Sequence, residues 1–132
     1  MSPLPSELIY VVDDYEDVRF SMKLLLEREG YAVRDFPDAE SFLAVTDGRD
    51  ASCLLIDLNL SGHSGLDFLQ RLRALGVQVP AIMLSGNSLP FEFQLAAANV
   101  FHVLDKPTPA QDLLSWVSEA CASARCISKV SI

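Results

Sequence analysis

Short runs of apolar residues alternate along the chain with segments in which apolar residues recur about every three or four positions. The unbroken runs are typical of buried strands, whereas the periodic segments are typical of helices that pack on one face. The predicted strands cover residues 7–14, 31–36, 52–57, 80–85 and 100–107. The predicted helices cover residues 15–30, 38–46, 65–76, 90–98 and 108–124. The pattern predicts a strand followed by a helix, five times over.

Single residues at the ends of these segments support the boundaries. Gly30 and Gly76 follow periodic segments, where glycine is favoured because it readily adopts the left-handed conformation that ends a helix. Asp38 stands where a side chain can cap the next helix, and Pro109 lies in the first turn of the last one. The segment 31–36 alternates between apolar and polar residues, which indicates an outer strand.

Three helices carry apolar stripes that predict packing against the core. The stripe of the helix at 15–30 consists of Val18, Met22, Leu25 and Leu26. The stripe of the helix at 65–76 consists of Leu66, Leu69, Leu72 and Leu75. Trp116 belongs to a similar stripe in the last helix. The histidines His63 and His102 are expected to be exposed or only partly packed.

Strands that alternate with helices predict a parallel sheet covered by helices on both faces. Right-handed crossovers leave few topologies for such a chain. We therefore expect a doubly wound, flavodoxin-like α/β fold with strand order 2-1-3-4-5, in which ligands bind beyond the carboxyl ends of the strands. The domain is expected to span 7–124, with an N-terminal tail at 1–6 and a C-terminal tail or the start of a linker at 125–132.

Composition narrows the class of protein. The 132 residues suit one domain, half of them are hydrophobic, and the formal net charge is −8. Such a charge repels polyanions, so we expect no nucleic-acid binding by this domain itself. No apolar run approaches the roughly 20 residues that span a bilayer, and no signal-peptide pattern is present, so we expect a cytoplasmic protein without a membrane contact. Cys53, Cys121 and Cys126 are expected to be free thiols.

Polar side chains stand at the carboxyl ends of four predicted strands. Asp13 and Asp14 end the first strand, Asp57 the third, Ser85 the fourth and Lys106 the fifth. In the expected strand order these four strands are neighbours. Three carboxylates, a hydroxyl and an ammonium are therefore predicted to meet in one crevice.

Three close carboxylates raise one another's pKa values unless a cation lies between them. Mg²⁺ suits such a crevice because it binds carboxylate oxygens, waters and phosphate oxygens. An aspartate can also act as a phosphoryl acceptor and form an acyl phosphate. The crevice is thus predicted to hold Mg²⁺ beside a phosphoryl group carried on Asp57, with Ser85 and Lys106 binding the phosphoryl oxygens.

Four stretches of sequence carry a resemblance to a known family. "VVDD", "LLIDLNLSGHSGLDFL", "AIMLSG" and "VLDKP" occur in this order along residues 7–124. Together they resemble the receiver domain of bacterial two-component response regulators, in the CheY-like superfamily. The similarity is greatest to receivers that feed helix-turn-helix output domains.

The resemblance implies a role for each site residue. Asp57 matches the phosphoacceptor and a metal ligand, and Asp14 matches the aspartate that binds the metal directly. Asp13 matches the neighbour that acts through water, and Asn59 matches the residue whose backbone carbonyl completes the metal shell.

The remaining positions bind or regulate the phosphoryl group in the family. Ser85 matches the switch hydroxyl and Lys106 the phosphate-binding lysine. Pro107 matches a proline that is commonly cis. Asn59 and Asn87 match the positions that tune the lifetime of the acyl phosphate.

The resemblance also implies a function and partners. A sensor histidine kinase or phosphotransfer protein would give its phosphoryl group to Asp57 in the presence of Mg²⁺ or Mn²⁺. The face formed by the fourth helix, fifth strand and fifth helix would then control an output domain or partner protein, and is compatible with a homodimer. The chain would be a signalling module that at most catalyses its own phosphotransfer and dephosphorylation, and not a conventional enzyme.

Three positions depart from the family pattern. The family usually has an aromatic residue where this chain has Val103, which is stiff and too small to swing as a switch. Phe101 is expected on the same strand face and is a candidate substitute. Ser61 replaces a favoured proline, and the stretch 85–106 is about one residue short.

These departures leave two alternative hypotheses. One is a receiver-like interaction module whose switching is atypical or independent of phosphorylation. The other is a phosphatase with an aspartyl nucleophile, because "IDLN" faintly resembles the Asp-x-Asp motif of haloacid-dehalogenase-type enzymes. Asn59 cannot supply the acid that those enzymes need at the second position.

Overall fold

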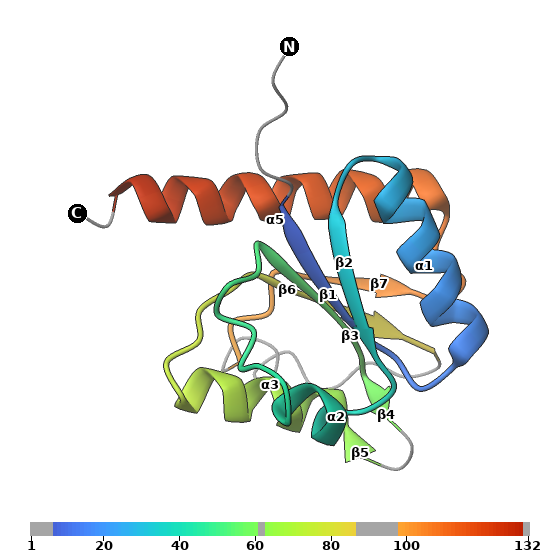
Figure 1. Cartoon of the computed structure of the whole chain (residues 1–132), viewed down its shortest axis with the longest axis horizontal. Helices are drawn as coiled ribbons and strands as arrows, with labels where there is room; N and C mark the ends of the chain where they lie inside the picture. The colour runs from blue at the N-terminus through green and yellow to red at the C-terminus, as the bar shows by residue number, and fades with distance from the viewer. Residues whose placement is uncertain (1–6, 61–62, 87–97, 131–132) are drawn as a thin grey trace.

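The computed structural model describes residues 7–60, 63–86 and 98–130. Its centre is a parallel five-stranded sheet in the order β2-β1-β3-β6-β7 (Figure 1). The strands are β1 (Leu8–Val12), β2 (Ala32–Phe36), β3 (Cys53–Asp57), β6 (Ala81–Ser85) and β7 (His102–Asp105). These are the five strands expected from the sequence, and the order 2-1-3-4-5 is confirmed.

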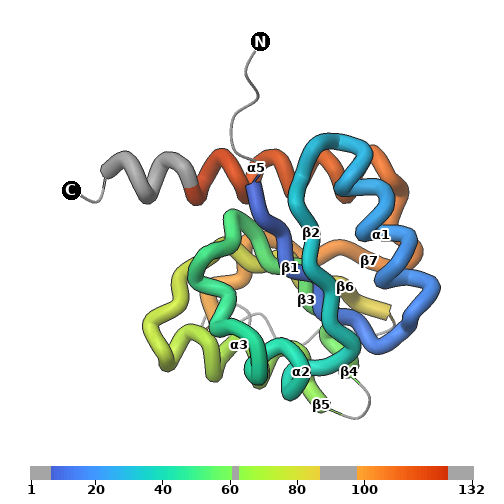
Figure 2. The backbone as a smooth tube through the Cα atoms, viewed as in Figure 1, coloured from blue at the N-terminus to red at the C-terminus, as the bar shows by residue number. Residues whose placement is uncertain are grey.

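Helices cover both faces of the sheet. They are α1 (Glu16–Arg28), α2 (Ala39–Leu43), α3 (Gly65–Ala74) and α5 (Ala110–Val130). The helices α1 and α5 lie on one face and α2 and α3 on the other, as the ribbon and the tube both show (Figure 1 and Figure 2). The predicted doubly wound architecture is therefore confirmed for the described residues.

Alternate residues of the strands enter the two cores. In β1, Ile9 and Val11 pack in the core under α1 and α5, whereas Tyr10 and Val12 pack in the core under α2 and α3. Because both faces of the sheet are covered, both sets are apolar and the strand reads as one unbroken apolar run. In the edge strand β2, Val33 and Phe36 are buried, whereas Arg34 is exposed and Asp35 only partly buried.

The predicted helix ends are largely confirmed. Gly30 and Gly76 have positive φ values of 97° and 87°, a conformation that glycine adopts without steric strain. The side chain of Asp38 accepts a hydrogen bond of 2.7 Å from the backbone N–H of Ser41 and caps α2. Pro109 immediately precedes α5 instead of lying within its first turn, and its carbonyl accepts from Leu113.

Three details of the prediction are wrong. The helix α5 does not end at residue 124 but continues to Val130, through the region where a tail or linker was expected. Leu75 does not join the buried leucine stripe and is 58% exposed. A two-stranded antiparallel ladder, β4 (Asn59–Leu60) with β5 (His63–Ser64), occupies what reads as a loop.

Some predictions fall on residues that the structure leaves undescribed. They concern Ser61, Asn87, the side chain of Cys126 and most of the helix at 90–98. The domain limits at 7 and 124 stay predictions. Cys53 and Cys121 are buried thiols, and burial raises the pKa of Cys53 well above its ordinary value. Among the described helices, none has the length and hydrophobicity needed to cross a membrane.

Candidate functional site

The carboxyl edge of the sheet gathers buried polar side chains. Within the described part of the chain, the polar or charged residues classed as buried are Asp13, Asp57 and Ser85, with exposed fractions of 0%, 3% and 2%. Asp57 and Ser85 end β3 and β6, and Asp13 directly follows β1. The parallel strands place all three at one edge, as the sequence predicts.

Lys106 joins two of these carboxylates. It follows β7, and its Nζ donates hydrogen bonds of 2.8 Å to Oδ2 of Asp13 and 3.0 Å to Oδ2 of Asp57. The ammonium also lies 5.5 Å from the centre of the Tyr15 ring. Its side chain is only 19% exposed, so these ion pairs are partly shielded from water. The structure thus brings together residues that are 93 and 49 positions apart in the sequence.

The surroundings of Asp57 have opposite effects on the pKa of its carboxyl. Burial raises the pKa of its carboxyl above the ordinary value, while hydrogen bonds from the backbone N–H of Asn59 and from Lys106 act to lower it. Burial also acts to lower the pKa of the Lys106 ammonium, but its hydrogen bonds to the two carboxylates outweigh burial and raise that pKa. Asp57 is therefore a poorly hydrated carboxylate that depends on a neighbouring cation.

The carboxylates have a spacing that suits a divalent cation. One oxygen each from Asp13, Asp14 and Asp57 lies within 4.8 Å of the other two. Oxygens on opposite sides of one Mg²⁺ ion are about 4 Å apart, so small side-chain rotations would bring the three into one coordination shell. Asp14 is half-buried, which leaves room for water or phosphate oxygens. The donor set fits Mg²⁺.

Asn59 and Ser85 occupy the positions expected of them. Asn59 is exposed at the start of β4, two residues beyond Asp57, and its N–H contacts Oδ1 of Asp57 at 3.0 Å. Ser85 is paired in register with Asp105, and its carbonyl accepts a hydrogen bond from the N–H of Lys106. The Lys106–Pro107 peptide bond is cis, as the resemblance implies.

The structure adds two residues that sequence reasoning missed. Gly65 begins α3 so close to β3 that a Cβ atom there would collide with the backbone carbonyl of Asp57. Arg19 in α1 donates a hydrogen bond of 2.8 Å to the backbone carbonyl of Asp13. The signal that could have marked Gly65 is its place at the start of a predicted helix, where glycine is not needed to end a helix or form a turn.

Phe101 does not replace the missing switch aromatic. The expectation that it shares a face with Val103 is wrong, because β7 begins only at His102 and Phe101 turns to the other layer. Phe101 packs in the core under α1 and α5, with its ring centre 6.3 Å from that of Trp116, whereas Val103 packs in the core under α2 and α3.

The histidine expected to be partly packed has a specific partner. His102 stacks on Trp116 with 3.5 Å between ring centres and 13° between ring planes. Burial lowers the pKa of His102. Trp116 is half-buried against the core, so its predicted packing is confirmed.

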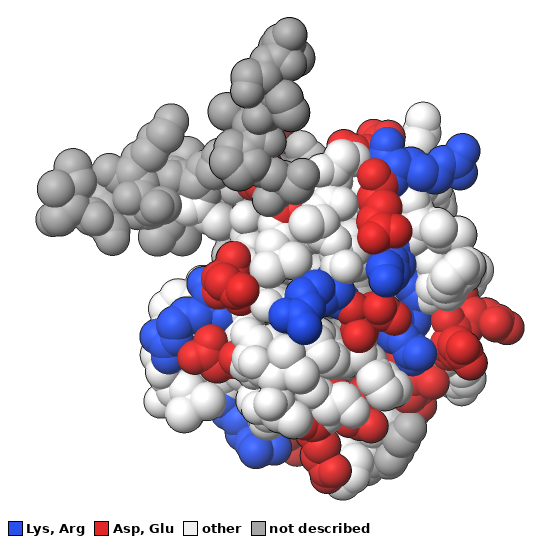
Figure 3. Space-filling model, in the orientation of Figure 1, with Lys and Arg blue, Asp and Glu red and all other residues white. Residues whose placement is uncertain are grey.

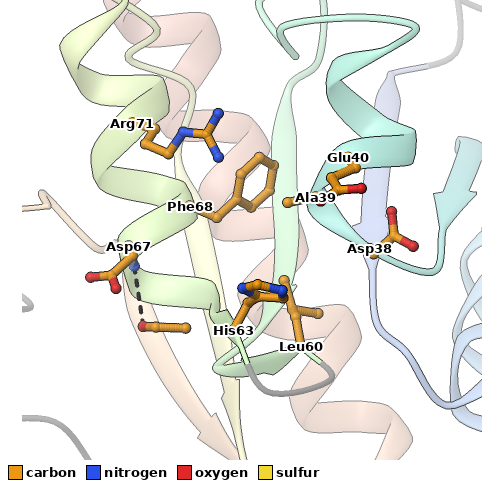
Figure 4. A pocket seen from close by; sticks show the side chains of 9 residues that line it. Asp38, Ala39, Glu40, Leu60, His63, Asp67, Phe68 and Arg71 are labelled. Atoms are coloured by element: carbon orange, nitrogen blue, oxygen red, sulfur yellow. Dashed lines mark hydrogen bonds between the residues drawn. The ribbon is translucent and has the colours of Figure 1, made fainter.

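A pocket lies away from the carboxylates. It has a volume of about 340 Å³, and Phe68, Ala39 and Leu60 line it between α2 and α3 (Figure 4). Asp38, Glu40, His63 and Arg71 surround it with mixed charge, and none of the six predicted site residues lines it. Acidic and basic side chains are likewise interspersed over the face of the molecule in Figure 3. The carboxylate crevice remains the distinctive chemical feature.

Comparison with known proteins identifies the family. Residues 9–118 match the family model of the response regulator receiver domain. The chain belongs to this family. Receiver domains are signalling modules of two-component systems, and an acidic pocket that binds Mg²⁺ is general among them. The match supports neither the phosphatase hypothesis nor that of an interaction module with atypical or phosphorylation-independent switching.

Curated relatives are identical to this receiver domain at about 30% of the aligned positions. TdiR of Thauera aromatica, a transcriptional regulatory protein, is 34% identical over 118 residues, which cover 89% of this chain and 52% of TdiR. The response regulator TmoT of Ectopseudomonas mendocina is 32% identical over 86% of this chain and 52% of its own length. The transcriptional regulatory protein FixJ of Bradyrhizobium diazoefficiens is 28% identical over 88% of this chain and 57% of FixJ. The receiver domain spans about half the length of these relatives.

Solved structures have the same fold. The response regulator StyR superposes with a TM-score of 0.85 at 23% identity, over 96% of this chain and 65% of StyR. A CheY-like receiver from Methanospirillum hungatei superposes with a TM-score of 0.83 at 26% identity, over 92% of this chain and 98% of its own. The receiver fold is therefore shared over nearly the whole chain.

Proposed function

We propose that this receiver domain accepts a phosphoryl group on Asp57 in a reaction that requires Mg²⁺ or Mn²⁺. The observation that carries the proposal is the bridge from Lys106 to the buried carboxylates of Asp13 and Asp57. Asp14 lies beside them at a spacing that suits a shared cation. This is a crevice for a metal ion and one further anion.

In the proposed reaction, one carboxylate oxygen of Asp57 attacks the phosphorus atom of a phosphohistidine. A new O–P bond forms, the N–P bond breaks, and the imidazole keeps the electron pair and takes up a proton. A bound divalent cation offsets charge on the phosphoryl oxygens. Because the carboxylate is desolvated by burial, little water must be displaced before the attack.

Other residues of the chain would bind the phosphoryl group. Lys106 is positively charged and partly shielded from water. Its ammonium would pair with the phosphoryl oxygens in place of the Asp57 carboxylate. Ser85 ends the adjacent strand, and its hydroxyl would donate a hydrogen bond to another of these oxygens. Asn59 would offer its backbone carbonyl to the metal.

A groove next to the site is suited to the phosphoryl donor. It has a volume of about 570 Å³ and lies between α1 and the start of α5, with Lys106 and Pro107 in its lining. Its wall is mainly apolar, and Phe20 and Leu24 of α1 are 58% and 45% exposed nearby on that helix. A sensor kinase or phosphotransfer protein would cover these apolar groups while presenting its phosphohistidine to Asp57.

The output of the domain is proposed to be transcriptional. TdiR and FixJ are named transcriptional regulatory proteins and are about twice the length matched here. We propose that this domain likewise controls a helix-turn-helix output, through the surface of β7 and α5 or through a homodimer formed there. Phosphorylation would change the population of the binding-competent surface.

Phosphorylation with a small-molecule donor tests the proposal. The protein is incubated with acetyl phosphate and Mg²⁺, and its intact mass is measured. We expect a gain of one phosphoryl group, which requires the metal and is lost in Asp57→Asn. The matched control is Asp67→Asn, which alters an exposed aspartate of α3 and should leave the gain unchanged. Failure of the folded, Mg²⁺-containing protein to gain mass would exclude the proposed acceptor.

A further inference from the structure

Asp13 is held at each of its four polar groups. Its backbone N–H donates to the carbonyl of Phe36 at 3.1 Å. Its Oδ1 accepts from the N–H of Tyr15 at 2.9 Å, and its Oδ2 accepts from Lys106 at 2.8 Å. The fourth group, the backbone carbonyl, accepts from Nη1 of Arg19 at 2.8 Å. Since Asp13 has no exposed surface, each of these contacts replaces one with water.

Arg19 is itself fixed by a second contact. Its Nε donates to Oδ2 of Asp35 in β2 at 2.8 Å, and its side chain is only 15% exposed. The planar guanidinium thus spans from a carboxylate on the edge strand to the main chain at the end of β1. Lys23, one turn later in α1, reaches the same Asp35 carboxylate at 3.6 Å and has no contact with Asp13 among the described interactions.

The carbonyl that Arg19 holds belongs to the peptide unit between Asp13 and Asp14. Because this unit is planar, the direction of its carbonyl fixes the position of the Asp14 Cα atom as well as that of Asp13. Both side chains belong to the carboxylate cluster. Arg19 therefore controls the orientation of two carboxylates while lying outside the cluster.

We infer that Arg19, oriented by Asp35, is a positioning residue for the divalent metal site. It keeps the Asp13–Asp14 peptide unit in the orientation that directs both carboxylates toward Asp57. The inference rests on the proposed function, because it presupposes that the cluster binds Mg²⁺. Outer contacts of this kind typically change metal affinity by about ten-fold or more when they are removed.

Titration of each folded variant with Mg²⁺ alone tests the inference. Backbone amide resonances near Asp13 and Asp57 are followed by NMR, and thermal denaturation without metal is measured in parallel. We expect Arg19→Met to weaken Mg²⁺ binding by about ten-fold. Arg19→Lys keeps the charge but replaces the planar donor group, and we expect it to weaken binding by several-fold. This variant also serves if Arg19→Met does not fold. Asp35→Asn should weaken binding in the same direction.

The matched control is Lys23→Met, which removes the other cation that contacts Asp35. It should lower thermal stability slightly and leave Mg²⁺ affinity unchanged. The inference is overturned if folded Arg19 variants bind Mg²⁺ as tightly as Lys23→Met does, because Arg19 then acts on stability alone. Wild-type affinity in Asp35→Asn would overturn the role given to Asp35. If the wild-type protein itself binds no Mg²⁺, the proposed function fails with the inference, so the two failures are distinguishable.

Discussion

Lys106 is the residue on which the charge balance of the crevice depends. It is the cation that pairs with Asp13 and Asp57 among the ion pairs of the described residues, and both carboxylates are almost fully buried. Removing one partner of such a group leaves the other charge uncompensated in a poorly solvated place, which costs more than losing a surface pair. Lys106 therefore contributes to stability as well as to the proposed chemistry.

We predict that Lys106→Met lowers the free energy of unfolding at neutral pH by about 2 kcal/mol. Mg²⁺ should restore part of this loss, since a cation that binds only the folded state stabilises it. Urea denaturation with and without Mg²⁺ measures both effects. Lys23→Met alters a more exposed pair and should cost less than about 0.5 kcal/mol, with no Mg²⁺ rescue. Equal losses in the two variants would contradict the prediction.

His102 should make stability depend on pH. Burial lowers its pKa below the ordinary value of 6.5, so the unfolded chain takes up this proton before the folded protein does. The contribution of His102 to stability is therefore fully present above that value and declines as the pH falls through it toward the lowered pKa. It levels off below the folded-state pKa.

We predict that the difference in unfolding free energy between wild type and His102→Gln shrinks from about pH 8 to about pH 5.5. Chemical denaturation of both proteins across this range measures the difference. The comparison cancels titrations elsewhere in the chain, and the lost stacking on Trp116 adds a constant offset. A difference that does not change with pH would contradict the lowered pKa.

At the scale of the elements, α3 must start directly against β3. Gly65 is the first residue of α3, and its N–H donates to the carbonyl of Leu58 at 2.8 Å. A side chain at this position would meet the backbone of Asp57, which no rotamer change relieves. The closeness of the two elements thus depends on a missing side chain.

We predict that Gly65→Ala lowers the free energy of unfolding by about 2 kcal/mol or more, because one element must move away from the other. Urea denaturation gives the value. Gly86→Ala is the matched control, since a Cβ there meets nothing within 4 Å, and its effect should be small. Similar effects at the two glycines would show that α3 is free to shift.

The elements differ in how far the sequence predicts them. The central strands β1, β3 and β6 were predictable because burial on both faces makes each an almost unbroken apolar run, bounded by turn residues. The end of α5 was not, because no glycine or proline follows residue 109 to stop the helix. Leucines spaced by three drift about 60° around a helix at each step, so Leu75 points away from Leu66. The ladder of β4 and β5 is too short to carry a period.

The site residues at the strand ends were predictable for a topological reason. Parallel strands bring their carboxyl ends together, so polar residues that follow apolar runs must meet. The position of Phe101 was not predictable, because alternation fixes the face of a side chain only within a strand, and Phe101 precedes β7. Arg19 was equally hidden, because a helical arginine reads as a solvent-exposed residue until its contacts with Asp13 and Asp35 are known.

At the scale of the whole molecule, the proposed docking of a donor protein concerns the surface beside the crevice. The groove between α1 and α5 opens beside Lys106, and Phe20 and Leu24 are exposed apolar residues of α1 outside its lining. A small donor such as acetyl phosphate needs only the crevice. A protein donor needs the surface as well. Comparing the transfer rates from the two donors therefore distinguishes an effect on the chemical step from an effect on docking.

We predict that Phe20→Ser with Leu24→Ser slows transfer from a phosphorylated kinase or phosphotransfer protein by ten-fold or more, corresponding to about 1.4 kcal/mol or more of lost binding. The rate with acetyl phosphate should not change. Radiolabelled phosphotransfer and intact mass measure the two rates. Val45→Ser, at another exposed apolar residue, is the control and should affect neither. Parallel slowing with both donors would instead indicate damage to the crevice.

The crevice is assembled from chain segments that are far apart. Lys106 meets Asp13 across 93 residues, and the contact exists only when β1, β3 and β7 have taken their places in one sheet. A nascent or partly unfolded copy has the same aspartate but lacks the ammonium and the neighbouring carboxylates around it. On the proposed function, such a copy would accept no phosphoryl group, so the response would be confined to folded molecules.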